Sequence, residues 1–140
     1  MADETALAKL LGERDLGVLA TLKRDGRPQM SNVNYHYDAA RRLIRISITG
    51  DRAKARNLAR DPRASLHVTT PDGSAYVVAE GTAELSAIAA DPHDAAVEQL
   101  IAVFRDIKGE HPDWDDYRRA MVADRRRLLG LRVERLYGMA

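Results

Sequence analysis

Alternating apolar and polar positions predict six β-strands. In residues 43–49, Ile44, Ile46 and Ile48 fall on one face and polar residues on the other, the period of two that is typical of a half-buried strand. The other predicted strands cover residues 16–22, 29–37, 63–69, 75–86 and 129–137. Turn sequences such as Asp25-Gly26 separate neighbouring strands and indicate antiparallel pairing. Six short strands in a small chain favour a closed or nearly closed barrel, because closure removes exposed sheet edges.

Apolar residues recur at helical spacing in four other segments. A short helix is predicted over residues 4–12, and a second over residues 51–60. A third starts at Asp91-Pro92, which we interpret as an N-cap followed by proline at the first helical position, and a fourth covers residues 114–127. The predicted fold class is therefore α+β, mainly β, with peripheral helices and a single domain over residues 1–140.

Composition removes several classes of function. The chain has no cysteine, so it has no disulfide, thiol nucleophile or iron–sulfur cluster. Lys plus Arg total 22 against 21 Asp plus Glu, which argues against a general nucleic-acid binder. No apolar run approaches the roughly 20 residues of a membrane span. The N-terminus lacks the pattern of a signal peptide, and we expect a cytoplasmic protein with no membrane partner.

The near-neutral total hides an uneven distribution of charge. Residues 41–63 carry a net charge of +6, whereas residues 80–116 carry −8. The basic stretch places Arg52 and Lys54 in the first turn of the predicted helix, where the helix dipole disfavours cations. A bound phosphate or carboxylate would reverse that cost. The alternative is that Asp51 caps the helix and the two cations point into water.

The strand that begins at Gln29 is unusually polar, because Ser31, Asn32 and Asn34 interrupt its apolar positions. Amide groups both donate and accept hydrogen bonds, which suits the polar edge of a flavin-like ring. The alternative is an edge strand whose polar residues face solvent. The sequence has no nucleophile elbow, P-loop or paired-histidine motif, so no catalytic residue and no metal ligand are assigned.

Several segments, taken in order, resemble one family. They are Gly17–Thr21, Asp25–Val33, Arg52–Leu58, Asp61–Ser65, Val78–Ala83 and Asp113–Arg118. The chain resembles the pyridoxamine-phosphate-oxidase-like flavoproteins and, within them, is most similar to the actinobacterial oxidoreductases that use the deazaflavin coenzyme F420. The resemblance implies an antiparallel split β-barrel of the FMN-binding type, which forms homodimers with the cofactor in a groove at the dimer interface.

The resemblance also implies roles for individual residues. Lys54 would contact the cofactor phosphate, and the strand after Asp25-Gly26 would lie along the ring. Arg126 would reach the cofactor from the partner chain. The full set of predicted cofactor-binding residues is Gln29, Met30, Ser31, Asn32, Ser47, Arg52, Lys54, Asn57, Tyr76 and Arg126.

In such a protein the cofactor performs the redox chemistry and the protein binds and orients it. We therefore expect hydride transfer from reduced deazaflavin to an unsaturated small molecule. The basic residues Arg52, Lys54, Arg56 and Arg60 suit a cofactor that carries a phosphate and a carboxylate-rich tail. FMN is the alternative cofactor, because FMN enzymes share this fold and lysine. A non-catalytic protein that stores or carries a flavin is the third interpretation.

Overall fold

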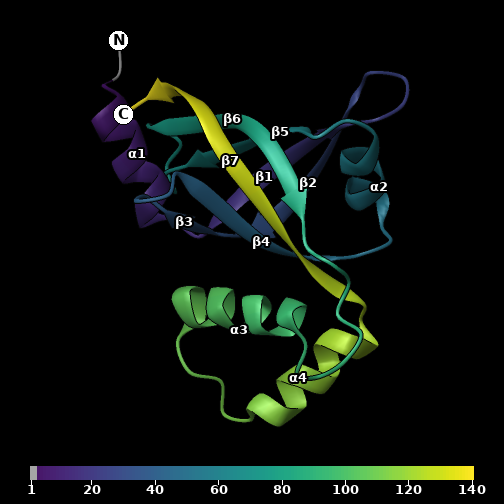
Figure 1. The fold of residues 1–140 in the computed structure, drawn as a ribbon. Helices are drawn as coiled ribbons and strands as arrows, with labels where there is room; N and C mark the ends of the chain where they lie inside the picture. The colour runs from purple at the N-terminus through teal and green to yellow at the C-terminus, as the bar shows by residue number, and fades with distance from the viewer. Residues whose placement is uncertain (1–2) are drawn as a thin grey trace.

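The computed structural model describes residues 3–140. Four helices and seven strands make up the described chain (Figure 1). The strands are β1 (Leu16–Leu22), β2 (Pro28–Asn34), β3 (His36–Asp38), β4 (Leu43–Thr49), β5 (Arg63–Thr69), β6 (Tyr76–Leu85) and β7 (Arg126–Met139). The helices are α1 (Glu4–Glu13), α2 (Ala53–Arg60), α3 (Ala95–Lys108) and α4 (Trp114–Ala123).

One antiparallel sheet curls into a split barrel, with the strand order β2-β1-β5-β6-β7-β4-β3. The two ends of this order are joined by the chain itself, because β2 and β3 flank Tyr35. The prediction of a mainly β split barrel is confirmed, but the prediction of six strands is wrong by one. The segment predicted as one strand over residues 29–37 divides at Tyr35, where the chain leaves its partner β1 and begins to pair with β4.

Tyr35 fixes this division from inside the barrel. Its side chain is 0% exposed, and its hydroxyl donates a hydrogen bond to the Leu11 carbonyl of α1 at 2.5 Å. Burial raises the pKa of this phenol, so the hydroxyl remains a donor. The same helix places Leu7 and Leu10 in the barrel core, and α1 thereby covers one end of the barrel (Figure 1).

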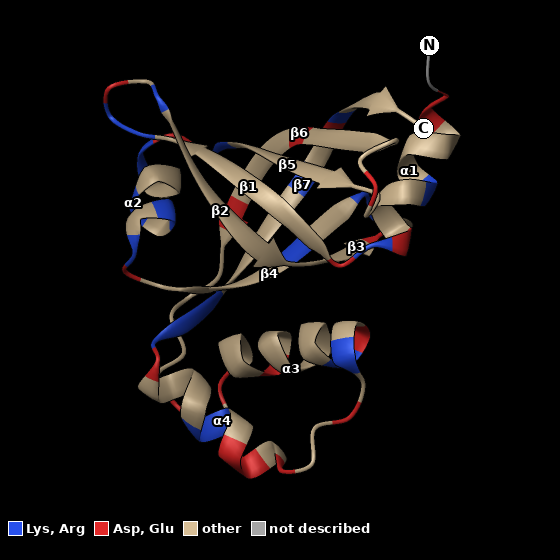
Figure 2. Cartoon of the chain, turned by 180° about the vertical axis from the view of Figure 1, so that it is seen from behind, with Lys and Arg blue, Asp and Glu red and all other residues tan. Residues whose placement is uncertain are grey.

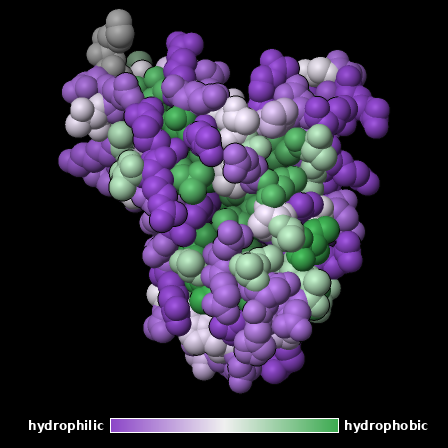
Figure 3. Space-filling view, in the orientation of Figure 1, coloured by the Kyte–Doolittle hydropathy of each residue, from purple (hydrophilic) through white to green (hydrophobic). Residues whose placement is uncertain are grey.

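Helices α3 and α4 lie together below the barrel in the view of Figure 1, against β4 and β7, whereas α1 and α2 lie at its left and right. They have a hydrophobic core of their own, built around Val97, Leu100 and Tyr117 and separate from the barrel core. Hydrophobic side chains are visible across the middle of one molecular face, near the level at which the helix pair meets the barrel (Figure 3).

Two predicted helix boundaries are wrong. Helix α3 begins after Asp94 rather than at Asp91-Pro92, because the Asp94 side chain accepts hydrogen bonds from the Val97 and Ala90 amides. Helix α4 ends at Ala123, and residues 126–128 belong to β7. The reversal occurs at Arg125, whose φ of 51° lies in the left-handed region. No helix within residues 3–140 is long and apolar enough to cross a membrane.

Candidate functional site

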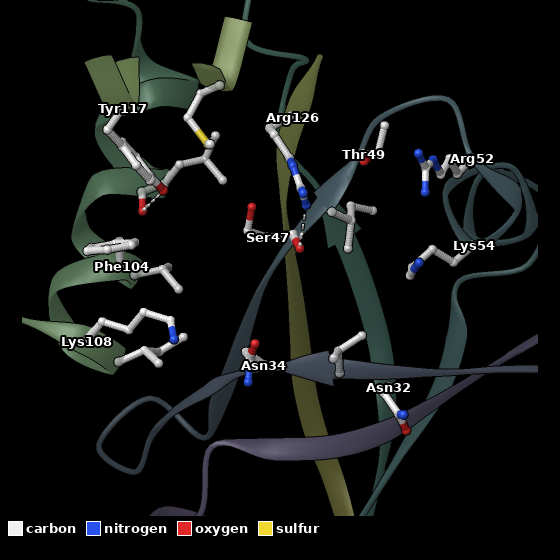
Figure 4. A pocket seen from close by; sticks show the side chains of 16 residues that line it. Asn32, Asn34, Ser47, Thr49, Arg52, Lys54, Phe104, Lys108, Tyr117 and Arg126 are labelled. Carbon is white, nitrogen blue, oxygen red and sulfur yellow. Dashed lines mark hydrogen bonds between the residues drawn. The ribbon is translucent and has the colours of Figure 1, made fainter. Parts of the chain in front are cut away.

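A pocket of about 380 Å³ lies between the outer surface of the barrel and the helix pair α3–α4 (Figure 4). Its barrel wall consists of polar side chains from the outer faces of β2 and β4, namely Asn32, Asn34, Ser47 and Thr49. Its helical wall is apolar and aromatic, with Leu100, Val103, Phe104, Ile107, Tyr117 and Met121. The pocket therefore has one wall that can form hydrogen bonds and one that can pack against a ring.

The alternation of β4 explains the polar wall. Ile44, Ile46 and Ile48 are buried inside the barrel. The polar residues between them therefore lie on the outside of the barrel. They are nevertheless half-buried, because the helix pair covers this part of the outer face. The barrel interior is filled with side chains, so this covered outer face is where a ligand can bind.

The N-terminus of α2 forms the cationic end of this pocket. Arg52 occupies the N-cap position and makes no side-chain capping hydrogen bond. Asp51 does not cap the helix, so that part of the alternative interpretation is wrong, whereas Arg52 is exposed, as the alternative expects. Arg52 and Lys54 both line the pocket, and the first turn of α2 contains no acidic residue. The positive helix end and two cations therefore point to one place.

Arg126 is the first residue of β7, and its side chain lines the same pocket as these two cations (Figure 4). Its Nη1 lies 3.5 Å from the Ser47 carbonyl oxygen, while its Nε is buried and has no hydrogen-bond partner among the described residues. Burial, together with the nearby charges of Arg52 and Arg126, lowers the pKa of Lys54. Within residues 3–140, none of these three cations forms an ion pair with a carboxylate. The cluster lacks the negative charge that would balance it.

Two further cavities continue this cationic surface along α2. The first shares Arg52 and Lys54 with the pocket and adds Gln29, Ser31, Arg56 and one acidic residue, Asp51. The second lies between α2 and the β1–β2 turn, and its basic lining residues are Lys23, Arg24, Arg56 and Arg60. Figure 2 shows this concentration of Lys and Arg on α2 and the adjoining turn, together with the basic start of β7.

The structure brings most of the predicted cofactor-binding residues together. Asn32, Ser47, Arg52, Lys54 and Arg126 line the pocket, and Gln29 and Ser31 line the neighbouring cavity. Arg126 was predicted to contact the cofactor from the partner chain, but here it lines the same pocket as Arg52 and Lys54 of its own chain.

Two predicted residues, Met30 and Tyr76, lie elsewhere, and a third, Asn57, lines the cavity beside Arg56 and Arg60 but uses its side chain internally. Met30 points outward from β2 and is 61% exposed, and Tyr76 stacks on His67 at the start of β6. Asn57 is only 7% exposed, and its amide is used internally: Nδ2 donates to Thr21 Oγ1 at 3.1 Å, and Oδ1 accepts from Arg60.

Sequence reasoning missed the helical wall and part of the polar wall. Asn34 and Thr49 share their strand faces with predicted residues, so the period of two was a usable signal for both. Phe104, Lys108 and Tyr117 carried no such signal, because the sequence predicts amphipathic helices but not the surface against which they pack. Trp114 contacts two lining residues, with ring centroids 5.7 Å from Phe104 and 5.5 Å from Tyr117.

Comparison with solved structures shows the same fold. The chain is 23% identical to a conserved hypothetical protein of Mycobacterium tuberculosis, with a TM-score of 0.76 over 99% of this chain and 85% of that one. It is 24% identical to a protein named F420 reductase, with a TM-score of 0.69 over 98% of each chain. A heme-binding protein of Mycobacterium smegmatis is 23% identical, with a TM-score of 0.71, and matches 99% of this chain but only 55% of that one.

The model of the pyridoxamine 5'-phosphate oxidase family matches residues 4–140, which is nearly the whole chain. Such coverage includes every helix and strand described above. The chain therefore belongs to the pyridoxamine 5'-phosphate oxidase family.

Proposed function

We propose that this protein is an oxidoreductase that uses the deazaflavin coenzyme F420. The observation that carries the proposal is the cluster of Arg52, Lys54 and Arg126, none of which forms an ion pair with a carboxylate of the described residues. A phosphate at the N-terminus of α2 would accept hydrogen bonds from the free backbone amides and from these cations. The buried Arg126 Nε without a partner fits a site whose charge balance requires an anion.

The two walls of the pocket suit a flat heterocycle with one polar edge. Amide and hydroxyl groups of Asn32, Asn34 and Ser47 would meet the edge of the ring, and Phe104 would pack against its apolar part. The basic surface that continues to Arg56 and Arg60 would suit a carboxylate-rich tail. This extension favours a deazaflavin over FMN, which has one phosphate and no such tail.

The bound, reduced deazaflavin would supply the hydride for reduction of an unsaturated small molecule. The chain would hold the phosphate with Lys54 and Arg52 and orient the ring edge with the polar residues of β2 and β4. The helix pair would shield the ring face from bulk solvent, and a single bound water or a nearby polar group would complete protonation of the product.

We also propose that the protein acts as a homodimer. Apolar side chains of the sheet are exposed at its outer surface, with Leu16 at 55% and Met139 at 62%. A second copy would cover such residues, and the partner would complete the groove around the cofactor. Sedimentation equilibrium tests this directly, and a monomer at micromolar concentration would contradict it.

Titration of the apo protein with F420, FMN and haem tests the cofactor proposal. Haem belongs in the panel because one structural neighbour is a heme-binding protein. Trp114 is the only tryptophan and contacts the pocket wall, so quenching of its fluorescence reports binding. We expect saturable binding of F420 that is tighter than binding of FMN.

Lys54→Met should weaken F420 binding by about 1.5–3 kcal/mol, the range for a hydrogen bond to a charged group. Lys9→Met is the matched control, because Lys9 pairs with Glu13 on α1, outside the pocket. Tight FMN binding without F420 binding would overturn the deazaflavin assignment. F420 binding without turnover of any acceptor in a broad panel would favour a carrier protein over an enzyme.

A further inference from the structure

The pocket has a fourth cation, Lys108, at the end remote from α2. Lys108, in the last turn of α3, extends across the pocket toward Asn34 of β2, whereas Arg52 and Lys54 lie on the opposite side (Figure 4). Ser47 and Arg126 lie between these two ends (Figure 4), and the lining also includes the apolar side chains of Val33, Ile48, Val103, Phe104 and Ile107. One cavity therefore offers two separate positions for negative charge.

Lys108 has no acidic partner because the nearest acidic residues in the sequence are already paired. Asp106 forms an ion pair with Arg45 of β4, and Glu110 accepts from Arg105 at 2.8 Å. No carboxylate of residues 3–140 lies within ion-pair distance of the Lys108 ammonium. A cation near the C-terminus of a helix interacts favourably with the helix dipole. This interaction explains a lysine in the last turn of α3, but it does not explain why the Lys108 side chain lines a pocket.

The ion pair of Asp106 also attaches the backbone of the last turn of α3, which carries Lys108, to the barrel. The Asp106–Arg45 ion pair ties the last turn of α3 to β4, and the Arg45 guanidinium contacts His36 of β3 at 2.7 Å. The backbone that carries Lys108 is thus attached to the barrel on the side where Asn34 lies. A ligand at this end would meet the ammonium group of the exposed Lys108 beside apolar side chains.

We propose that this end of the pocket binds the acceptor substrate, and that the substrate is a flat, unsaturated carboxylic acid. Its apolar body would lie against Ile107, next to the ring that Phe104 contacts in the proposed function, and its carboxylate would pair with Lys108. Naming this ligand a substrate rests on the proposed function, in which a cofactor anion occupies the opposite, α2 end. Lys108 is in this view a residue that determines specificity.

Binding of trans-cinnamate and of its uncharged methyl ester to protein without cofactor tests the proposal. Isothermal titration is done with the wild type, Lys108→Met, Lys54→Met and the control Lys9→Met. Lys108→Met should weaken cinnamate binding about fivefold and change ester binding by less than about twofold, because an exposed ion pair contributes at most about that much. Lys108→Arg, which keeps the charge, should restore most of the affinity for cinnamate, and Lys9→Met should have no effect.

Three results would overturn the proposal. They are no saturable binding of cinnamate to the wild type, equal effects of Lys108→Met on acid and ester, and a loss of cinnamate binding in Lys54→Met but not in Lys108→Met. Because no cofactor is present, these outcomes are independent of the F420 titration. A failure of the cofactor proposal with an intact Lys108 effect would leave the acid-binding end standing.

Discussion

Asn57 offers a direct test of how α2 is held on the barrel. The resemblance to flavoproteins places this residue at the cofactor, yet its side chain is buried and hydrogen-bonded to Thr21 and Arg60. Arg60 in turn donates to the Leu22 carbonyl at 2.8 Å. We therefore expect Asn57 to act as a tether between α2 and β1.

The loss in the free energy of unfolding that Asn57→Ala causes can be worked out from the polar group that loses its hydrogen-bond partner. The Thr21 side chain is 1% exposed, so its hydroxyl would lose its partner without gaining water. An unsatisfied buried polar group costs about 1–3 kcal/mol. With a urea m-value of about 2 kcal/mol per molar, a loss of about 2 kcal/mol lowers the unfolding midpoint by about 1 M.

A double-mutant cycle isolates the contact. Urea unfolding is measured for Asn57→Ala, Thr21→Val and the combination, and a coupling energy of about 1 kcal/mol is expected for residues in direct contact. Hydrogen exchange should accelerate in residues 53–60 of Asn57→Ala. An unchanged midpoint together with lost F420 binding would refute the tether and make Asn57 a direct cofactor contact.

Two further predictions concern the bulge and the cation cluster. Gly81→Ala should destabilise the protein severely, because a Cβ at this β6–β7 bulge would overlap the Arg132 carbonyl. Gly130→Ala is the control and should be tolerated, because the atom nearest to its added Cβ, on the Leu43 side chain, lies 3.4 Å away. Equal thermal midpoints for the two variants would contradict this prediction. Arg126→Met should raise the pKa of Lys54 toward its ordinary 10.5, as read from the NMR titration of its Nζ. The pKa of Lys54 is lower in the folded state than in the unfolded state, so the unfolded state binds more protons at pH values between the two pKa values. The free energy of unfolding therefore rises with pH across this window, and Arg126→Met should make that rise smaller.

The strands were the predictable part of the fold because their pattern is local. Three strands, β1, β4 and β5, have the predicted bounds, since apolar alternation and turn residues specify them within a few residues of the chain. The division at Tyr35 was not predictable in this way. It depends on the Leu11 carbonyl, 24 residues away in sequence, and on a change of pairing partner from β1 to β4.

Two parts of the candidate site, the cationic end at α2 and the polar face of β2, could be predicted because each depends on the local sequence alone. The missing acidic residue in the first turn of α2 is visible without a structure, and so is the polar face of β2. The wall made by Phe104 and Lys108 required tertiary information. An amphipathic helix shows which face it buries but not the element that receives that face.

The arrangement of the two hydrophobic cores restricts where this protein can bind a ligand and how its specificity can change. The barrel interior is filled by its own side chains, so a ligand of flavin size must bind to the outer surface. The outer face of β4 is polar, and only the covering helix pair turns it into a pocket. Because that pair has its own core, substitutions at Phe104 or Lys108 can alter the ligand wall while the barrel residues that hold the α2 end stay unchanged. In the proposed function, specificity for the acceptor would therefore vary on α3 and α4 independently of anion binding at Arg52 and Lys54.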